Sequence, residues 1–253
     1  MKKTVFFVIF LALVQLLTAQ QAGETVRGDF VINGKTLVRY TGKGGETLII
    51  PTSLGITEIG PGVFGRSTLM NFRIPEGVTT IAADAFAYSK VKAIQLPSSL
   101  TIIGDKAFYG CKDLASIVLP TTVERIGEGA FCYSGLTQIG MPKQLRIIEK
   151  FAFYECTKLA SINLPEGLRE IGDSAFYKTG LTRISFNDGL NTIGTTAFSQ
   201  CTELIGISLP ATLTVIGDQA FAGCTKLQNI RISSNTILGS GVFQGVRATP
   251  VLY

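Results

Sequence analysis

The sequence predicts a repeat solenoid, in which short coils of chain stack along one axis and pair their strands into a parallel β-sheet. Phenylalanine recurs every 22 or 23 residues from Phe64 to Phe243, and each phenylalanine lies in the same pattern of apolar residues. No stretch long enough for a domain linker interrupts this period. A unit of this length holds one strand and one or two turns, so it can bury its apolar side only against its neighbours. We therefore expect one elongated domain.

The first residues have the features of a secretory signal peptide. Lys2 and Lys3 precede an apolar run from Val5 to Leu17, and small and polar residues follow. The run covers 13 residues, whereas crossing a bilayer takes about 20. We expect residues 1–19 to be removed on export and the remaining chain to reach the periplasm, the cell surface or the medium.

Residues 20–46 are expected to cap the first repeat. Within them, the segment Asp29–Tyr40 alternates apolar and polar residues around Asn33 and Gly34, which is a strong signal for a β-hairpin. A solenoid needs such a cap because the first strand of its sheet would otherwise leave an open edge.

The repeats occupy residues 47–243 in about nine turns, and a short tail, residues 244–253, follows. A well-formed unit, at residues 114–131, reads Leu-x-x-Ile-x-Leu-Pro-x-x-Val-x-x-Ile-Gly-x-x-Ala-Phe. The Ile-x-Leu pair alternates as in a half-buried strand, and proline ends that strand. We expect the Ile-Gly step to turn the chain, and the acid that often follows it to cap one short helical turn. These acids are Asp105, Glu128, Asp173 and Asp218.

The repeated pattern resembles the BspA-like leucine-rich repeat family of bacterial and protist surface proteins, whose unit adds a cysteine three residues after the phenylalanine. The resemblance extends from Thr47 to Phe243. It implies a leucine-rich repeat solenoid: a curved right-handed coil with its parallel sheet on the concave side and short turns or 3-10 segments on the convex side. It also implies adhesion to host matrix proteins or to other cells. The expected core is the column of Phe64, Phe86, Phe108, Phe131, Phe153, Phe176, Phe198, Phe221 and Phe243.

The outward positions of the predicted sheet are the candidate ligand-binding surface. They are polar, small and almost free of acid, so an extended partner could dock over several turns through many weak hydrogen bonds. The alternative is plain solvated strand surface. The arginines are the first residues to test, because arginine is enriched in interface hot spots. The candidates are Asn71, Arg73, Gln95, Gln138, Asn163, Arg183, Asn229 and Arg231.

Four cysteines lie three residues after a repeat phenylalanine and so share one column, while Cys132 stands apart. Only Cys201 and Cys224 fall on adjacent turns, and the spacing leaves open whether they form a disulfide. Small buried apolar side chains are the expected role. The chain has no histidine, so we expect no metal site and no cofactor.

Five tyrosines follow the repeat phenylalanines by one or two residues. Either the rings cover the turn beside the core with their hydroxyls in water, or they form an aromatic strip that contacts a partner. Their close adherence to the repeat favours the first interpretation. They are Tyr88, Tyr109, Tyr133, Tyr154 and Tyr177.

The amino-acid composition argues against several classes of function. A net charge of +5 without a basic run argues against nucleic-acid binding. The absence of histidine excludes Ser-His-Asp and Cys-His catalysis, and the carboxylates recur with the repeat instead of forming one distinctive pair. We expect an exported, non-enzymatic protein-binding module of adhesin type that contacts host matrix or cell-surface proteins through the concave sheet. The alternative is a structural envelope component that self-associates through a weakly capped C-terminal edge.

Overall fold

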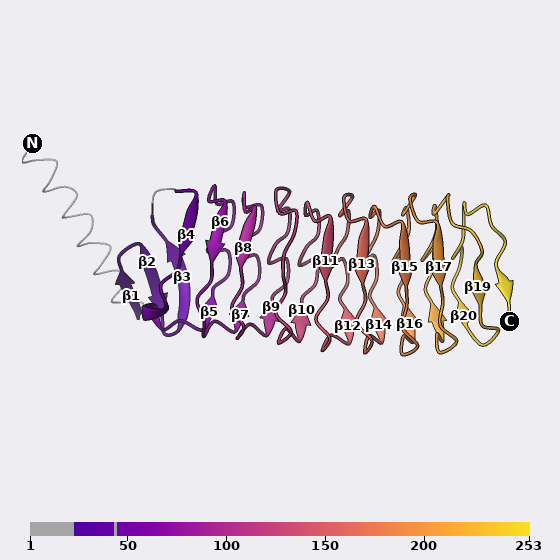
Figure 1. Ribbon diagram of the computed structural model, residues 1–253, viewed down its shortest axis with the longest axis horizontal. Coiled ribbons are helices and arrows are strands. Elements are labelled where there is room, and N and C mark those ends of the chain that lie inside the picture. Colours follow the sequence, from indigo (N-terminus) through magenta and orange to yellow (C-terminus); the bar gives the residue numbers. More distant parts are fainter. Residues whose placement is uncertain (1–22, 43–44) are drawn as a thin grey trace, which may run out of the picture.

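A computed structural model describes residues 23–42 and 45–253. The coils stack along one long axis, with the N-terminal strands at one end and the C-terminus at the other (Figure 1). The protein is therefore a parallel β-solenoid, as the repeat predicts. The predicted signal peptide and parts of the predicted cap lie outside the described residues.

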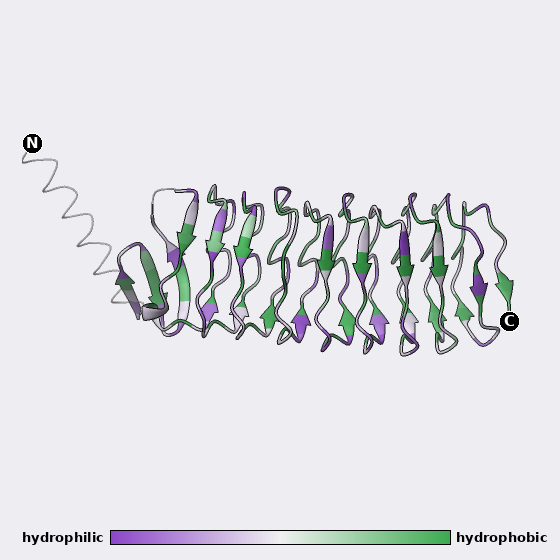
Figure 2. Ribbon diagram, in the orientation of Figure 1, coloured by the Kyte–Doolittle hydropathy of each residue, from purple (hydrophilic) through white to green (hydrophobic). Residues whose placement is uncertain are grey.

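The Ile-x-Leu segments pair in parallel as predicted, in separate ladders of two or three strands that together we call the long-strand sheet. Its strands show an exposed–buried–exposed pattern in β11, β13 and β15, because the central isoleucine points inward. Figure 2 shows the resulting mixture of hydrophilic and hydrophobic residues along single strands. The strands are β4 (Thr47–Ile49), β6 (Asn71–Arg73), β8 (Ala93–Gln95), β11 (Gln138–Gly140), β13 (Ser161–Asn163), β15 (Arg183–Ser185), β17 (Gly206–Ser208), β19 (Arg231–Ile232) and β21 (Val251–Leu252).

A second parallel ladder corrects the expectation that the Ile-Gly step simply turns the chain. The residue before the isoleucine and the isoleucine itself pair with the next coil, as Glu170 pairs with Thr192 and Ile171 with Ile193, in every coil step except that from Arg125–Ile126 to Ile147–Ile148. Each coil is thus a flattened loop with a strand on both sides. These strands are β5 (Glu58–Ile59), β7 (Thr80–Ile81), β9 (Ile102–Ile103), β10 (Arg125–Ile126), β12 (Ile147–Ile148), β14 (Glu170–Ile171), β16 (Thr192–Ile193), β18 (Val215–Ile216) and β20 (Ile237–Leu238).

Three strands precede the repeats. β1 (Glu24–Arg27) pairs antiparallel with β2 (Phe30–Asn33), and β2 pairs antiparallel with β3 (Thr36–Tyr40). β3 then pairs parallel with β5. These strands therefore extend the second ladder beyond the first repeat. The only 3-10 helix in the described chain is η1 (Thr52–Leu54), which ends at Gly55 in the left-handed conformation.

The turn that carries each repeat phenylalanine forms a third set of hydrogen bonds between coils. The amide of Phe131 donates to the carbonyl of Ala152 at 2.9 Å, and that of Phe153 donates to the carbonyl of Ala175 at 2.8 Å. In every coil, the residues two before and two after the phenylalanine have positive φ, including bulky ones such as Tyr133 at 57°. The stacked backbone holds L-residues in a conformation that costs about 1–2 kcal/mol each.

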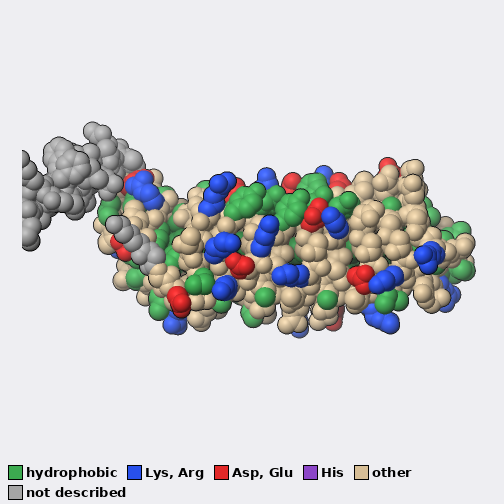
Figure 3. Space-filling model, turned by 90° about the horizontal axis from the view of Figure 1, so that it is seen from above, with side chains coloured by type: hydrophobic (Ala, Val, Ile, Leu, Met, Phe, Trp, Pro, Cys, Tyr) green, Lys and Arg blue, Asp and Glu red, His purple; other side chains and the backbone are tan. Residues whose placement is uncertain are grey.

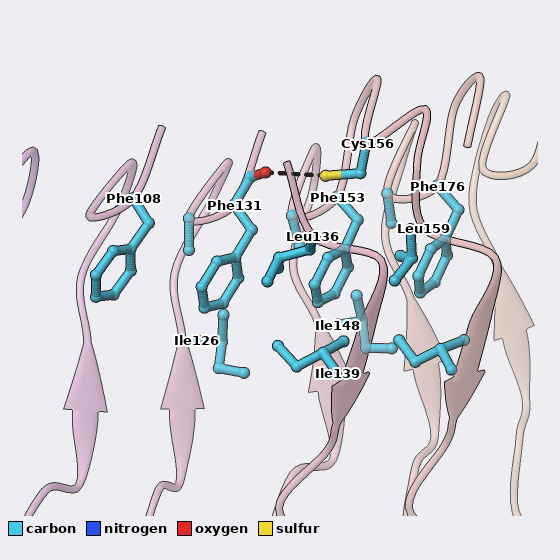
Figure 4. Close-up of a cluster of buried hydrophobic side chains, with 14 of the residues drawn as sticks. Phe108, Ile126, Phe131, Leu136, Ile139, Ile148, Phe153, Cys156, Leu159 and Phe176 are labelled. Carbon is cyan, nitrogen blue, oxygen red and sulfur yellow. Dashed lines mark hydrogen bonds between the residues drawn. The ribbon is translucent and has the colours of Figure 1, made fainter. Parts of the chain in front are cut away.

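The repeat phenylalanines stack face to face through the centre of the solenoid. Figure 4 shows Phe108, Phe131, Phe153 and Phe176 as one column above the inward isoleucines and leucines. The rings of Phe108 and Phe131 are 5.4 Å apart and inclined by 3°. Eight of the nine are buried, whereas Phe243, at the end of the column, is only partly buried.

The acids after the Ile-Gly step do not cap helical turns as expected. Instead, the carboxylate accepts a hydrogen bond from an amide of the next coil, as Asp173 does from Thr195 at 2.9 Å and Asp218 from Ser240 at 2.7 Å. The turn contains no helix in these coils, so its free amides point along the stack rather than along a helix axis. The three aspartates therefore stabilise contacts between coils, whereas the Glu128 carboxylate accepts no such bond from a described residue.

In the first part of the cysteine column, cysteines alternate with serine or threonine residues from one coil to the next. The thiol of Cys156 donates to the carbonyl of Phe131 at 3.0 Å (Figure 4) and lies 3.3 Å from the hydroxyl of Ser134 in the preceding coil. Cys201 repeats this arrangement with Phe176 and Thr179. All five cysteines are buried free thiols, so Cys201 and Cys224 form no disulfide.

Candidate functional site

The outward surface of the long-strand sheet, which we call the long-strand face, carries every candidate ligand-binding residue. Strand register places them in rows across coils: Arg73 lies opposite Gln95, and Gln138 lies opposite Ser161. Arg183 lies opposite Gly206 in the next pair of strands. All of the candidates except the half-buried Asn71 are exposed. The candidates therefore lie on the same side of the solenoid, although the strand pairing of this face is interrupted, as between β8 and β11.

The long-strand face combines small polar side chains with isolated positive charges. Its outward strand positions hold three arginines, Arg73, Arg183 and Arg231, and no carboxylate. None of the three forms an ion pair with another described residue. The face is thus suited to a partner that offers carboxylates or backbone carbonyls.

A central hollow of about 500 Å³ lies on this face. Gln138 and Asn163 line it, together with Val118, Gly140 and Met141. The side chain of Val118 is 85% exposed, the highest value of any large apolar residue in the described chain. Two amide side chains beside exposed apolar groups give the hollow both hydrogen-bonding and hydrophobic character, as in binding sites generally.

Two local features open the central hollow. The unit at residues 114–131, which shows the repeat pattern clearly in the sequence, forms no strand of the long-strand sheet. Its residues 114–120, between β8 and β11, have no strand structure. Gly140 occupies an outward position of β11, and a Cβ placed there would have no neighbour within 4 Å. Gly140 and Met141 are not among the candidate binding residues predicted from the sequence. Their departure from the Ile-x-Leu-Pro pattern, as Ile-Gly-Met-Pro, is the signal that could have identified them.

Smaller hollows flank the central one. Arg73 and Gln95 line an N-terminal hollow of about 300 Å³ with Ile49, which is 59% exposed. Asn229 and Arg231 line a C-terminal hollow of about 280 Å³. Six of the eight candidates therefore line hollows of the same face.

Asn71 and Arg183 line none of these hollows, and Arg231 makes a further contact. The amide of Asn71 donates to the carbonyl of Glu46 at 3.1 Å, so it is used within the fold. Arg183 lies on the open face outside the three hollows. The guanidinium of Arg231 lies 5.2 Å from the ring centroid of Tyr253, a cation–π contact that holds it over β21.

The described residues offer little for catalysis. They contain no group of three or more histidine, cysteine or acidic side chains that could hold a metal ion. Burial raises the pKa of the Cys111, Cys156 and Cys201 thiols to about 11 and that of Cys132 to about 12. These thiols are protonated near neutral pH and poor nucleophiles.

The repeat, the stacked core and the broad polar face together define a leucine-rich repeat scaffold. The family profile described as BspA type leucine rich repeat region matches residues 45–145 and 124–249, in six copies. The chain belongs to this family, whose solenoids generally act as protein-interaction scaffolds without catalysis. No curated protein matches the chain.

Solved structures share this fold. A leucine rich cell surface protein from Faecalibacterium prausnitzii A2-165 is 22% identical, with a TM-score of 0.67 over 90% of this chain and 76% of that one. A leucine-rich repeat protein from Bacteroides ovatus ATCC 8483 is 22% identical, with a TM-score of 0.53 over 88% and 82%. The pneumococcal vaccine antigen PcpA is 23% identical, with a TM-score of 0.50 over 89% and 78%. At these identities the similarity shows the fold alone. No helix in the described chain is long and apolar enough to cross a membrane.

Proposed function

We propose that the protein is exported, with residues 1–19 as its signal peptide, and acts as an adhesin-like module that binds a host matrix or cell-surface protein through the long-strand face. The observation that carries this proposal is the central hollow of about 500 Å³, which polar and exposed apolar side chains line together. The description of the F. prausnitzii neighbour as a cell surface protein supports the location.

Charge supports a protein partner with acidic side chains. Three arginines are spread over the face from β6 to β19, and a partner that spans several coils would meet each of them. A carboxylate can accept two parallel hydrogen bonds from one guanidinium. Truncating such an arginine in a central position typically weakens binding by about 1–2 kcal/mol or more.

Binding of the chain from Gln21 onward to a panel of purified extracellular matrix proteins tests this function. The matched variant changes Arg73, Arg183 and Arg231 to serine. Saturable binding that the variant loses supports the proposal. Saturable binding that is equal in both chains contradicts the assignment to this face, and no binding by either chain contradicts the adhesin function.

Self-association is the second candidate, because the C-terminal coil exposes an apolar surface. Ile237 and Leu238 of β20 are 68% and 42% exposed, and Val251 and Leu252 of β21 are 59% and 62% exposed. Both strands are the last of their ladders in the described chain, so their outer backbone groups are available for pairing with a second copy.

Sedimentation velocity over a range of micromolar concentrations tests self-association. A concentration-dependent assembly that Leu252→Lys abolishes supports the second candidate. A monomer at all concentrations contradicts it, and so does an assembly that the substitution leaves intact.

A further inference from the structure

Five tyrosines form a continuous row of rings on the edge of the stack that carries the phenylalanine turns, and we call this row the tyrosine edge. Successive ring centroids lie 5.1, 5.4, 5.6 and 4.8 Å apart. Figure 3 views this edge from above: a hydrophobic stripe covers the central part of the stack, and both basic and acidic side chains border it. The members are Tyr88, Tyr109, Tyr133, Tyr154 and Tyr177.

The tyrosine edge is not part of the core. Tyr88 is 53% exposed, and the other four rings are half-buried. Phe151 is 38% exposed and extends the aromatic surface, with its ring 5.7 Å from that of Tyr154. The chain has 7 tyrosines, and five of them lie in this row. Such contiguous exposed aromatic surface is typical of an interface.

From Tyr88 to Tyr154 the row has a period of two coils, which ends at Tyr177, whose ring stacks on that of Tyr154 at 10°. Tyr109 and Tyr154 directly follow their phenylalanines, whereas Tyr88 and Tyr133 come one residue later. Neighbouring rings from Tyr88 to Tyr154 are therefore inclined by 68–74°, and the same aspect returns in every second coil. Two coils of a parallel ladder span about 9.6 Å. One turn of a polyproline II helix, three residues, spans about 9.3 Å.

This match favours a partner in the polyproline II conformation. A polyproline II chain that runs along the row would present every third side chain to an equivalent pair of rings. Proline-rich segments in this conformation are bound by aromatic surfaces in several unrelated domains, because their order before binding lowers the entropic cost. The three ladder steps from Tyr88 to Tyr154 cover about 14 Å, which corresponds to about four to five residues of such a segment.

Positive charge beside the row favours a partner that carries negative charge. Lys112 and Lys158 line a hollow of about 280 Å³ beside Tyr133. Neither lysine forms an ion pair with a described carboxylate, whereas Glu155 in the same hollow pairs with Lys178 at 3.6 Å. Both lysines are exposed and available to carboxylates of a bound segment.

We infer that the tyrosine edge is a second binding surface, which takes an acidic, proline-rich segment of a partner protein in the polyproline II conformation. The tyrosine hydroxyls would donate hydrogen bonds to the carbonyls of that segment, since polyproline II leaves its backbone unpaired. Burial raises the pKa of Tyr133 and Tyr154, so these hydroxyls keep their protons. This surface is separate from the long-strand face, and its test does not depend on the function proposed there.

Fluorescence anisotropy with a labelled peptide of four Pro-Pro-Glu repeats tests the inference. The expected result is saturable binding that weakens at least tenfold in the double variant Tyr109→Ser/Tyr154→Ser and in the surface variant Lys112→Glu/Lys158→Glu. The lysine variant keeps the test valid if the tyrosine variant fails to fold. Gly140→Arg, on the long-strand face, should bind the peptide as the unchanged protein does.

Two control probes separate this partner from others. A peptide of four Gly-Ser-Glu repeats has the same charge without the preformed conformation and should bind at least tenfold more weakly. Equal affinity for both peptides, no binding of either, or binding that only Gly140→Arg abolishes overturns the inference. Binding of soluble β-glucan oligosaccharides at the tyrosines without binding of the proline peptide would also overturn it, because the edge would then be a glycan site.

Discussion

Truncation of one central phenylalanine should destabilise the whole solenoid. Phe131 is fully buried, and its ring stacks on those of Phe108 at 5.4 Å and Phe153 at 5.6 Å. Phe131→Ala leaves a cavity of phenyl size and removes both stacking contacts. Buried Phe→Ala substitutions cost about 3–5 kcal/mol. Each aromatic pair contributes about 0.5–1.5 kcal/mol to such a loss, so we expect a value in the upper half of that range.

Urea unfolding followed by circular dichroism measures this loss, and the end of the same column provides the control. Phe243 is partly buried and stacks only on Phe221 at 5.6 Å. Phe243→Ala should therefore cost about half as much or less. A loss below about 1 kcal/mol in Phe131→Ala, or equal losses at both positions, would refute the view that the column is the core. Phe131→Leu, expected to cost about 1–1.5 kcal/mol, serves if the alanine variant does not fold.

Three further predictions concern the backbone and the thiols. Gly217→Ala should lower the urea midpoint by the equivalent of about 1–3 kcal/mol, because its Cβ would lie 2.5 Å from the backbone nitrogen of Thr195; an unchanged midpoint would contradict this packing. Gln219→Gly should stabilise by about 0.5–1 kcal/mol, because φ is 54° there, while Gln228→Gly should destabilise. A loss at both positions would disprove the strain. Burial raises the pKa of Cys156 to about 11 from 9.0, so folded protein holds that proton more tightly than unfolded protein. The contribution of this thiol to the free energy of unfolding is complete below pH 9 and is lost as the pH rises toward 11. Cys156→Ser should therefore flatten the decline in melting temperature over this pH range. Identical profiles of melting temperature against pH for the two proteins would contradict the prediction.

Much of the architecture could be predicted from the sequence because the repeat imposes the same geometry on every coil. The spacing of the phenylalanines predicted the solenoid, and alternation predicted the long strands. The second ladder was missed because a strand of two residues, such as Arg125–Ile126, gives no alternation to detect. Its pairing comes from stacking identical coils, which is a tertiary effect.

The left-handed turn positions left only a partial sequence signal, because glycine occupies them in some coils and not in others. Glycine and asparagine normally mark positive φ, but here Lys106, Phe151 and Thr196 adopt it. The stacked hydrogen bonds override the local preference, and the sequence cannot express that. The acids were predicted to cap helical turns because the sequence does not show contacts between coils. The amides that donate hydrogen bonds to Asp173 and Asp218 belong to the next coil.

The sequence predicted which residues lie on the long-strand face but not where that face is hollowed. Strand alternation identified the outward residues, but the hollows depend on where a strand is missing and where glycine removes a side chain. Both conditions occur together only around Gly140, between residues 114–120 and β13. The exposure of the tyrosine row likewise required the positions of neighbouring turns.

The most direct test of the long-strand face compares two arginine substitutions in one coil for binding to the same matrix protein. Gly140→Arg fills the central hollow without strain, since a Cβ at that position has no neighbour within 4 Å. Ile147→Arg adds the same charge on the opposite ladder, at an outward side chain that is 41% exposed. The proposed function predicts that the first variant loses at least tenfold in affinity while the second binds as the unchanged protein does. Equal affinities for the two variants would contradict it.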